Sequence, residues 1–274
     1  MYQNSAAKSL LKSIQRLPSP PTVMIKLANL LQDADSDLNT LYDTLRQDSA
    51  LTAALLQQCG KTAHDARLVK TFEDAVNWLG FAEISRIAIS HYAWQATRDF
   101  SIQDREMVEM EWHHAMFSAI IAGILARKLG EHESSAFTIG LLHDIGKLVL
   151  LSKDPIKFKE VRPLQGSQLC TQETLTFGAN HAAIGAQLFL DWGLTSEMVG
   201  AVANHHKNVP HTKLGAILVV ANNLALGIRD RNRGVRFQDP ACVQALKDLE
   251  MTEEEVNSLD PDIQKDIKKY GALI

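Results

Sequence analysis

The sequence Leu-Leu-His-Asp-Ile-Gly-Lys at residues 141–147 decides how this chain is interpreted. A histidine and an aspartate, His143 and Asp144, stand side by side in an apolar run that continues through Leu-Val-Leu at residues 148–150. The run predicts a buried helix. A buried carboxylate costs free energy unless a partner pairs with it or a cation binds it. The function therefore depends on which other polar side chains converge on this pair.

Histidines on both sides of this stretch are the candidate partners. Taken singly, each has an ordinary explanation as a core or surface side chain, which we assign to His64, His91, His132 and His211, and also to His113 beside Trp112. The others fall on separate predicted helices, and helices packed around one core can bring ligands to a shared interior site. Imidazole and carboxylate groups suit divalent transition metals such as Fe, Mn, Ni or Zn. The candidate ligands are His114, His143, Asp144, His181, His205 and His206.

The spacing of apolar residues is helical almost throughout, and no alternating pattern is long enough to predict a strand, so we expect an all-α protein. The capping box at residues 71–74 predicts a helix that ends at Gly80, followed by another to about Phe100. One central helix should run from a cap at Ser134 or Ser135 through His143 to about Ser152, and residues 157–177 look less regular. Further helices are expected behind Asp37, over 112–130, 182–192, 195–205 and 212–226, and from Thr252 and Asp260.

A charged stretch, residues 101–111, marks the expected division of the chain. We predict an N-terminal helical subdomain at residues 1–105, a helical core at 106–228 and a helical tail at 229–274. Each N-terminal helix has an apolar face that needs a partner, so the subdomain should pack on the core and not stand apart. The sequence gives no functional interpretation of the tail.

Composition narrows the class of protein. The 274 residues are 46% hydrophobic and 22% charged, which is typical of a globular protein. A net charge of −4 gives no support for nucleic-acid binding driven by bulk charge. Three widely spaced cysteines (Cys59, Cys170 and Cys242) form neither a disulfide framework nor a zinc pair. With no apolar signal core and no run of about 20 apolar residues, we expect a cytoplasmic protein that binds neither nucleic acid nor membrane.

Several short blocks together resemble a known family. Residues 141–147 look like the signature of the HD superfamily of metal-dependent phosphohydrolases, and the whole chain resembles its HDOD branch, the HD-related output domain. The resemblance extends from about Leu17 to Leu226 and implies an HD-like helical bundle with a packed N-terminal subdomain, acting in bacterial signal transduction. The matching blocks are residues 17–21, 47–52, 69–75, Leu79-Gly80, Trp112-x-His114, 173–178, 181–185, 192–194 and His205-His206.

The resemblance also implies two metal positions that share Asp144. The first would use His114, His143, Asp144 and the position of Asn222. The second would use Asp144, His181, His205 and His206. One or two divalent ions are therefore expected, and Lys147 joins Asp144 as a candidate catalytic residue because it could contact a phosphate as a point charge.

Three departures from the family pattern bear on the expected function of the chain. Asn222 stands where HD hydrolases have their last metal-binding aspartate, so the first metal position has one negative charge fewer. Residues 57–59 read Gln-Gln-Cys where the family usually has an Asn-Ser pair. The Gly-Tyr-Pro element of relatives that degrade cyclic di-GMP is absent after His205-His206, where the chain continues Lys-Asn-Val-Pro.

Three hypotheses follow. The first is an HDOD-type regulatory protein that binds a signalling protein or a nucleotide or phosphate ligand, with weak or no hydrolase activity. The second is a metal-dependent phosphohydrolase acting on a nucleotide or another phosphate ester, which six of the seven family ligands favour. The third is a hydrogen-bonded polar core without metal. We favour the first.

Overall fold

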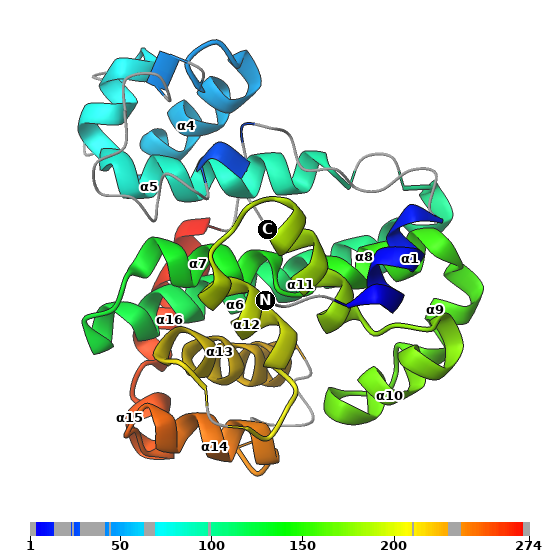
Figure 1. Cartoon of the computed structure of the whole chain (residues 1–274). Coiled ribbons are helices and arrows are strands. Elements are labelled where there is room, and N and C mark those ends of the chain that lie inside the picture. Colours follow the sequence, from blue (N-terminus) through cyan, green and yellow to red (C-terminus); the bar gives the residue numbers. More distant parts are fainter. Residues whose placement is uncertain are drawn as a thin grey trace.

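The computed structural model of the chain describes residues 4–13, 23, 25–27, 42–43, 45–62, 69–97, 100–209, 211–229 and 237–270. Within these ranges every regular element is a helix, which confirms the all-α prediction (Figure 1). The helix expected behind Asp37 lies outside the described residues, as does the block at residues 17–21. The helices are α1 Ser5–Lys12, α4 Ser49–Thr62, α5 Phe72–Gln95, η2 Ile102–Asp104, α6 Arg105–Leu129, α7 Glu133–Leu142, α8 Ile145–Lys153, α9 Pro155–Val161, α10 Gly166–Phe177, α11 His181–Asp191, α12 Ser196–Asn204, α13 Lys213–Arg229, α14 Pro240–Asp248, α15 Glu253–Asn257 and α16 Asp260–Tyr270.

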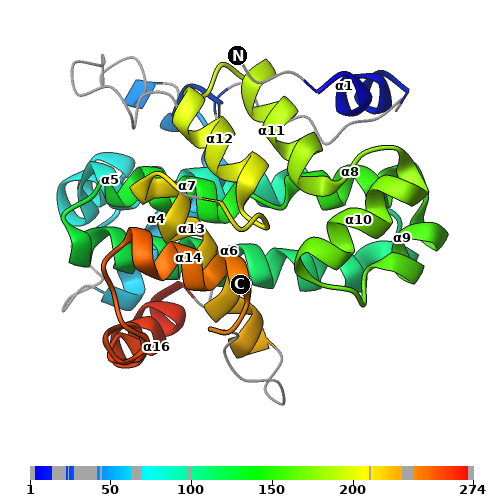
Figure 2. The ribbon, with the colours of Figure 1, turned by 60° about the horizontal axis from the view of Figure 1, so that its bottom comes forward.

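Helix α6 is the centre of the packing. It is 25 residues long, ends at Gly130 in the left-handed conformation as the sequence predicted, and packs against α7, α13 and α16. Helices α6 and α7 approach closely because Gly140 has no side chain: a Cβ there would lie 2.7 Å from Cα of Ala119. Figure 2 shows α4, α5 and α7 at one end of α6, with α8, α9 and α10 at the other.

Two hydrophobic clusters hold the helices together. The larger one joins α4 and α5 to α6, α7 and α11–α16, so these two helices of the first hundred residues share a core with the later ones. The smaller one joins α1, α8, α9 and α11. Helix α7 belongs to the first cluster and α8 to the second. The His143-Asp144 pair therefore lies where the two clusters meet.

The prediction of one continuous central helix is wrong. Helix α7 begins after His132, whose Nδ1 accepts from the backbone of Ser135, and it ends at Leu142. Asp144 has φ −97° and ψ 11°, and α8 starts after it. An apolar run cannot reveal this break, because both helices are buried. The 21-residue run 133–153 is apolar and long enough to cross a membrane, but 94% of its apolar window is buried inside the fold.

Gly146 explains the position of α11 relative to this break. A Cβ on Gly146 would overlap the backbone carbonyl oxygen of His181, so only glycine lets the start of α8 touch the start of α11. Gly185, one turn further along α11, repeats the close approach: a Cβ there would lie 3.3 Å from the carbonyl oxygen of His143. The glycine in the opening motif is therefore a packing residue that brings His181 to Asp144.

The structure confirms several of the predicted helix caps. Thr71 and Asp74 form the predicted capping box, and Gly80, at φ 74° and ψ 165°, interrupts α5 where a helix end was expected. Thr252 and Glu255 form the second predicted box. Asn180 and Thr195 cap α11 and α12.

Other expectations need correction. Residues 157–177, expected to be less regular, contain most of α9 and all of α10, with Asp154 capping α9 ahead of Pro155. The charged stretch 101–111, predicted to divide the chain, forms η2 and the start of α6, where Glu111 is only 5% exposed. The tail holds a third helix, α14, whose cap Asp239 and first residue Pro240 were overlooked.

A buried ion-pair cluster joins α5, α7 and α16. The carboxylate of Glu83 accepts from Arg86 at 2.7 Å and from the Tyr270 hydroxyl at 2.8 Å, and its other oxygen lies 2.8 Å from Lys269 Nζ. Arg86 also pairs with Glu133 at the start of α7. We call these five residues the Glu83 cluster. It connects the last described helix to the N-terminal helices.

Candidate metal centre

Asp144 is the hub of the predicted site. It is 4% exposed, and its Oδ2 atom faces three groups. His143 Nε2 lies 3.2 Å away, His114 Nε2 from the middle of α6 lies 3.4 Å away, and Lys147 Nζ donates a hydrogen bond of 2.6 Å. Burial by itself would raise the pKa of Asp144, but the His143 ring and the Lys147 ammonium group beside it outweigh burial and hold the pKa well below the usual range. The carboxylate is therefore ionised.

The other oxygen of Asp144, Oδ1, faces a second group of histidines. His181 Nε2, at the first residue of α11, is 3.4 Å away, and His205 Nε2, at the end of α12, is 3.7 Å away. His206 Nε2 lies 3.1 Å from His181 Nε2. All six residues predicted as metal ligands thus gather around one carboxylate, and Lys147 lies with them.

The imidazole rings are held in orientation by hydrogen bonds of their Nδ1 atoms, on the side away from Asp144. His143 Nδ1 is 2.8 Å from the carbonyl of Gly140, and His205 Nδ1 is 2.6 Å from the carbonyl of Val202. A carbonyl can only accept, so Nδ1 carries the proton, and Nε2 of the neutral ring presents its lone pair to the centre. His181 Nδ1 is 2.6 Å from Glu173 Oε2 in the same way. Metal-binding histidines in proteins are usually fixed like this by a carbonyl or carboxylate.

Glu173 was not assigned a role from the sequence, although it stands at the head of a block that resembles the family. It is fully buried, and it accepts from both the backbone nitrogen and Nδ1 of His181. Its distance of eight residues from His181 places it on the preceding helix, α10. In the sequence, only this spacing of eight residues could have indicated that Glu173 supports His181.

Several atoms at the centre lack a hydrogen-bond partner among the described residues: Asp144 Oδ1, His143 Nε2 and His205 Nε2. Burial lowers the pKa of His205 to about 4, so its ring is neutral at pH 7. An ionised oxygen and neutral imidazole lone pairs that face one another repel, since all are acceptors. A cation between them removes this conflict.

The spacing fits a metal ion. Two ligand atoms bound about 2.0–2.1 Å from one ion are separated by roughly 2.9–3.4 Å in octahedral or tetrahedral geometry. Oδ1 lies 3.4 Å from His181 Nε2 and 3.7 Å from His205 Nε2, and His181 Nε2 lies 3.1 Å from His206 Nε2, so these separations are in or just beyond that range. The donor set of three imidazoles and a carboxylate suits Zn, Fe, Mn or Ni.

A third group, Cys170, Glu173 and His181, also lies within ligand distance. Burial and the nearby Glu173 raise the pKa of the Cys170 thiol to about 12, so the neutral thiol is favoured at pH 7 in the metal-free protein. Glu173 and His181 Nδ1 already bond to each other. This group supports the ring of His181 and makes no second centre.

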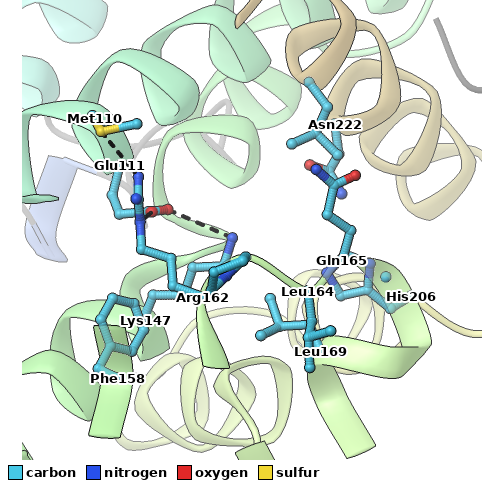
Figure 3. Close-up of a pocket in the computed structure, with 13 residues that line it drawn as sticks. Met110, Glu111, Lys147, Phe158, Arg162, Leu164, Gln165, Leu169, His206 and Asn222 are labelled. Atoms are coloured by element: carbon cyan, nitrogen blue, oxygen red, sulfur yellow. Dashed lines mark hydrogen bonds and ion pairs between the residues drawn. The ribbon is translucent and has the colours of Figure 1, made fainter. Parts of the chain in front are cut away.

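A pocket of 260 Å³ opens beside the histidine cluster. Figure 3 shows Glu111, Lys147 and Arg162 on one wall, and Asn222, Gln165 and His206 on the opposite wall. Phe158, Leu164 and Leu169 supply apolar surface. Glu111 and Arg162 were not predicted as site residues, because their contact joins α6 to the end of α9 across 51 residues.

Comparisons with known proteins agree with this architecture. Residues 17–208 match the model of the HDOD domain. A ribonuclease Y from Oleidesulfovibrio alaskensis is 33% identical over 137 residues, covering 50% of this chain and 21% of that protein. The chain spans between about a fifth and two fifths of the length of the curated relatives that head the comparison.

Two solved structures share the fold. An HDOD domain protein of unknown function from Geobacter sulfurreducens superposes with a TM-score of 0.73 at 21% identity, over 98% of this chain and 96% of that one. A protein from Shewanella amazonensis, named as a candidate phosphohydrolase, gives a TM-score of 0.70 at 24% identity, over 99% and 97% of the two chains. The family match covers most of the chain, and the fold agrees with it. This chain belongs to the HDOD family.

Proposed function

We propose that this chain is an HDOD-type regulatory module that holds one divalent transition-metal ion with Asp144, His181, His205 and His206, and that it turns over phosphate esters weakly or not at all. The observation that carries the proposal is Asp144 Oδ1, a buried, ionised oxygen that makes no hydrogen bond to any described group and faces imidazole nitrogens. A polar core without metal would pair such an atom.

The surroundings of the two carboxylate oxygens of Asp144 favour one bound ion over two. Oδ2 already accepts from the ammonium group of Lys147, which is 8% exposed. Asn222, which would complete the first metal position with a carboxylate, offers a neutral amide and lines the adjoining pocket. On the Oδ1 side, the described residues provide neither a cation such as Lys147 nor a neutral amide such as Asn222. Positive charge is therefore needed most on the side of His181, His205 and His206.

The chain's own residues would prepare a ligand site there. When bound, the ion supplies charge that attracts a phosphoryl oxygen. Lys147, at the boundary between cluster and pocket, offers a second positive group to the same ligand. Glu173 and the carbonyl of Val202 keep the imidazole rings in place. With one ion, the chain can hold a phosphate without the second ion that often activates water in such hydrolases.

A metal-dependent phosphohydrolase is the second candidate. It is favoured by the convergence of His114 and His143 on Asp144 Oδ2, which a site for one ion does not need. Because relatives over half of the chain are named ribonuclease Y, RNA belongs among the substrates to test.

Elemental analysis tests the metal. Protein purified without chelator should contain about one equivalent of Fe, Mn, Ni or Zn. His205→Ala should remove it, whereas His113→Ala, at the residue directly before His114 in α6, should retain it. Metal-free wild-type protein that takes up no ion from a panel of divalent metals would contradict the proposal.

Activity distinguishes the two candidates. Metal-loaded protein is incubated with a phosphomonoester, a phosphodiester and a short RNA. We expect turnover near background in the wild type. A turnover that rises strongly in Asn222→Asp would show that the lost carboxylate limits an otherwise complete centre. Fast turnover in the wild type would favour the hydrolase.

A further inference from the structure

The pocket beside the histidine cluster contains a second polar feature, an ion triad of Glu111, Lys147 and Arg162. Arg162 Nε donates to Glu111 Oε1 at 2.9 Å, and Lys147 Nζ lies 3.6 Å from Glu111 Oε2. Glu111 is 5% exposed, and Oε2 makes no hydrogen bond with the described part of the chain. A buried carboxylate thus lies between two cations, in the place that an anionic ligand would take.

Arg162 has donors to offer such a ligand. Its Nη2 donates to the thioether of Met110 at 3.2 Å, and sulfur is a weak acceptor. The planar guanidinium matches phosphate geometry and binds it through two parallel hydrogen bonds. A phosphate oxygen would replace the weak thioether contact with a charge-assisted one, at the mouth of the pocket where Arg162 is 23% exposed.

The rest of the pocket limits the ligand. Phe158, Leu164 and Leu169 form apolar surface that suits a flat, uncharged group. A volume of 260 Å³ is just below the range of roughly 300–1,000 Å³ typical of small-molecule sites. This description suits one nucleoside monophosphate better than a dinucleotide.

We infer that this pocket binds a small phosphate monoester of mononucleotide size, that Arg162 anchors its phosphate, and that Glu111 weakens the binding by holding both cations in the free protein. The inference deepens the proposed function, because the pocket adjoins the metal cluster through Lys147 and His206. It does not require the metal: Arg162 and Glu111 belong to the protein alone.

Calorimetric titration with adenosine 5′-monophosphate tests the inference, in EDTA and again with Mn²⁺. Arg162→Met should weaken binding at least about tenfold, since it removes the charge-assisted hydrogen bonds to the phosphate. Lys159→Met removes the same charge from an exposed position of α9 and should leave the affinity within about twofold of wild type, as expected for a remote, screened charge. Arg162 is partly exposed, so its replacement should not prevent folding.

Glu111→Gln is the second variant. The amide oxygen can still accept from Arg162 Nε, but the negative charge is gone, so the affinity for the monophosphate should rise about threefold or more. Glu109→Gln, exposed on the same helix, should have no effect. Adenosine without phosphate and a cyclic dinucleotide should both bind much more weakly than the monophosphate.

The outcomes separate this inference from the proposed function. Binding in EDTA that Arg162→Met abolishes supports the pocket even if no metal is found. Binding that needs Mn²⁺ and is unchanged in Arg162→Met places the phosphate on the metal and overturns the inference, while the metal site stands. Equal affinities of Glu111→Gln and wild type, equal binding of adenosine, or no binding under either condition would also overturn it.

Discussion

Two buried groups of charged residues in this fold are built in opposite ways. In the Glu83 cluster, both carboxylate oxygens of Glu83 face donors: Lys269 on one side, and Arg86 and Tyr270 on the other. Around Asp144, one oxygen is bonded to Lys147 and the other faces only imidazole nitrogens among the described residues. A carboxylate whose two oxygens both face a cation or a hydroxyl group fastens helices together. A carboxylate with one oxygen that faces no such group points to a ligand.

The difference should appear in what each cluster contributes to stability. Removing a partner from the Glu83 cluster should lower the free energy of unfolding under all metal conditions. Removing a histidine from the Asp144 cluster should act mainly through the bound ion. The following predictions test this contrast, from the largest expected effect to the smallest.

Gly146→Ala should be the most damaging substitution. Its Cβ would overlap the carbonyl oxygen of His181, so α8 and α11 would have to separate. We expect a loss of more than about 3 kcal/mol in urea unfolding, together with the loss of metal binding. Gly200→Ala is the control, because a Cβ there meets no atom within 4 Å, and it should be neutral or slightly stabilising. A Gly146→Ala protein with wild-type stability would refute the close-approach argument.

Glu83→Gln should lower the free energy of unfolding by about 3 kcal/mol, because it leaves Arg86 and Lys269 without their shared carboxylate. Urea unfolding should give the same loss with EDTA and with metal. The conservative amide retains the size of the side chain, so packing is preserved. A loss that depends on metal would contradict a purely structural role.

The same variant carries a pH signature. Burial would raise the pKa of Glu83, but the charges of Arg86 and Lys269 outweigh it and lower the pKa below the ordinary 4.5. The carboxylate therefore stabilises the fold above pH 4.5, and this contribution is lost as the pH falls through the lowered pKa. Wild type and Glu83→Gln should differ most at neutral pH and converge as the pH falls below 4.5 and through the lowered pKa. A constant difference across this range would show that charge is not the cause.

His205→Ala should abolish the stabilisation that metal gives. An ion at 100 times its dissociation constant adds about 2.7 kcal/mol to the free energy of unfolding. Thermal unfolding with and without metal should show this increase in wild type and in His113→Ala, but not in His205→Ala. If metal still stabilises the His205→Ala protein, the ion does not bind at Asp144 Oδ1.

Much of the fold could be predicted from local sequence. The capping boxes at Thr71 and Thr252 and the caps Asn180 and Thr195 were recognised because each depends on residues within one helical turn. The overlooked cap at Asp239 had the same kind of signal, with proline at the next position. The break between α7 and α8 was missed for another reason: it is imposed by contact with α11, and nothing in the apolar pattern marks it.

The candidate site also has a part that could be predicted from the sequence and a part that could not. The ligand types could be predicted because an aspartate buried beside histidines must pair with a partner or bind a cation, and few arrangements allow this. Glu111 and Arg162 could not be predicted. Each looks like an ordinary charged residue in the sequence, and their contact exists only because α9 packs back towards α6.

The sequence by itself determined that this protein is helical, where several of its helices begin, and which side chains are the candidates for the site around Asp144, because these properties depend on local spacing and on residue chemistry. Only the tertiary structure decided that Asp144 has one satisfied and one unsatisfied oxygen, and that Glu111 stands between two cations. Both facts depend on which groups from distant helices arrive within about 4 Å, the range in which a hydrogen bond or ion pair satisfies a buried charge.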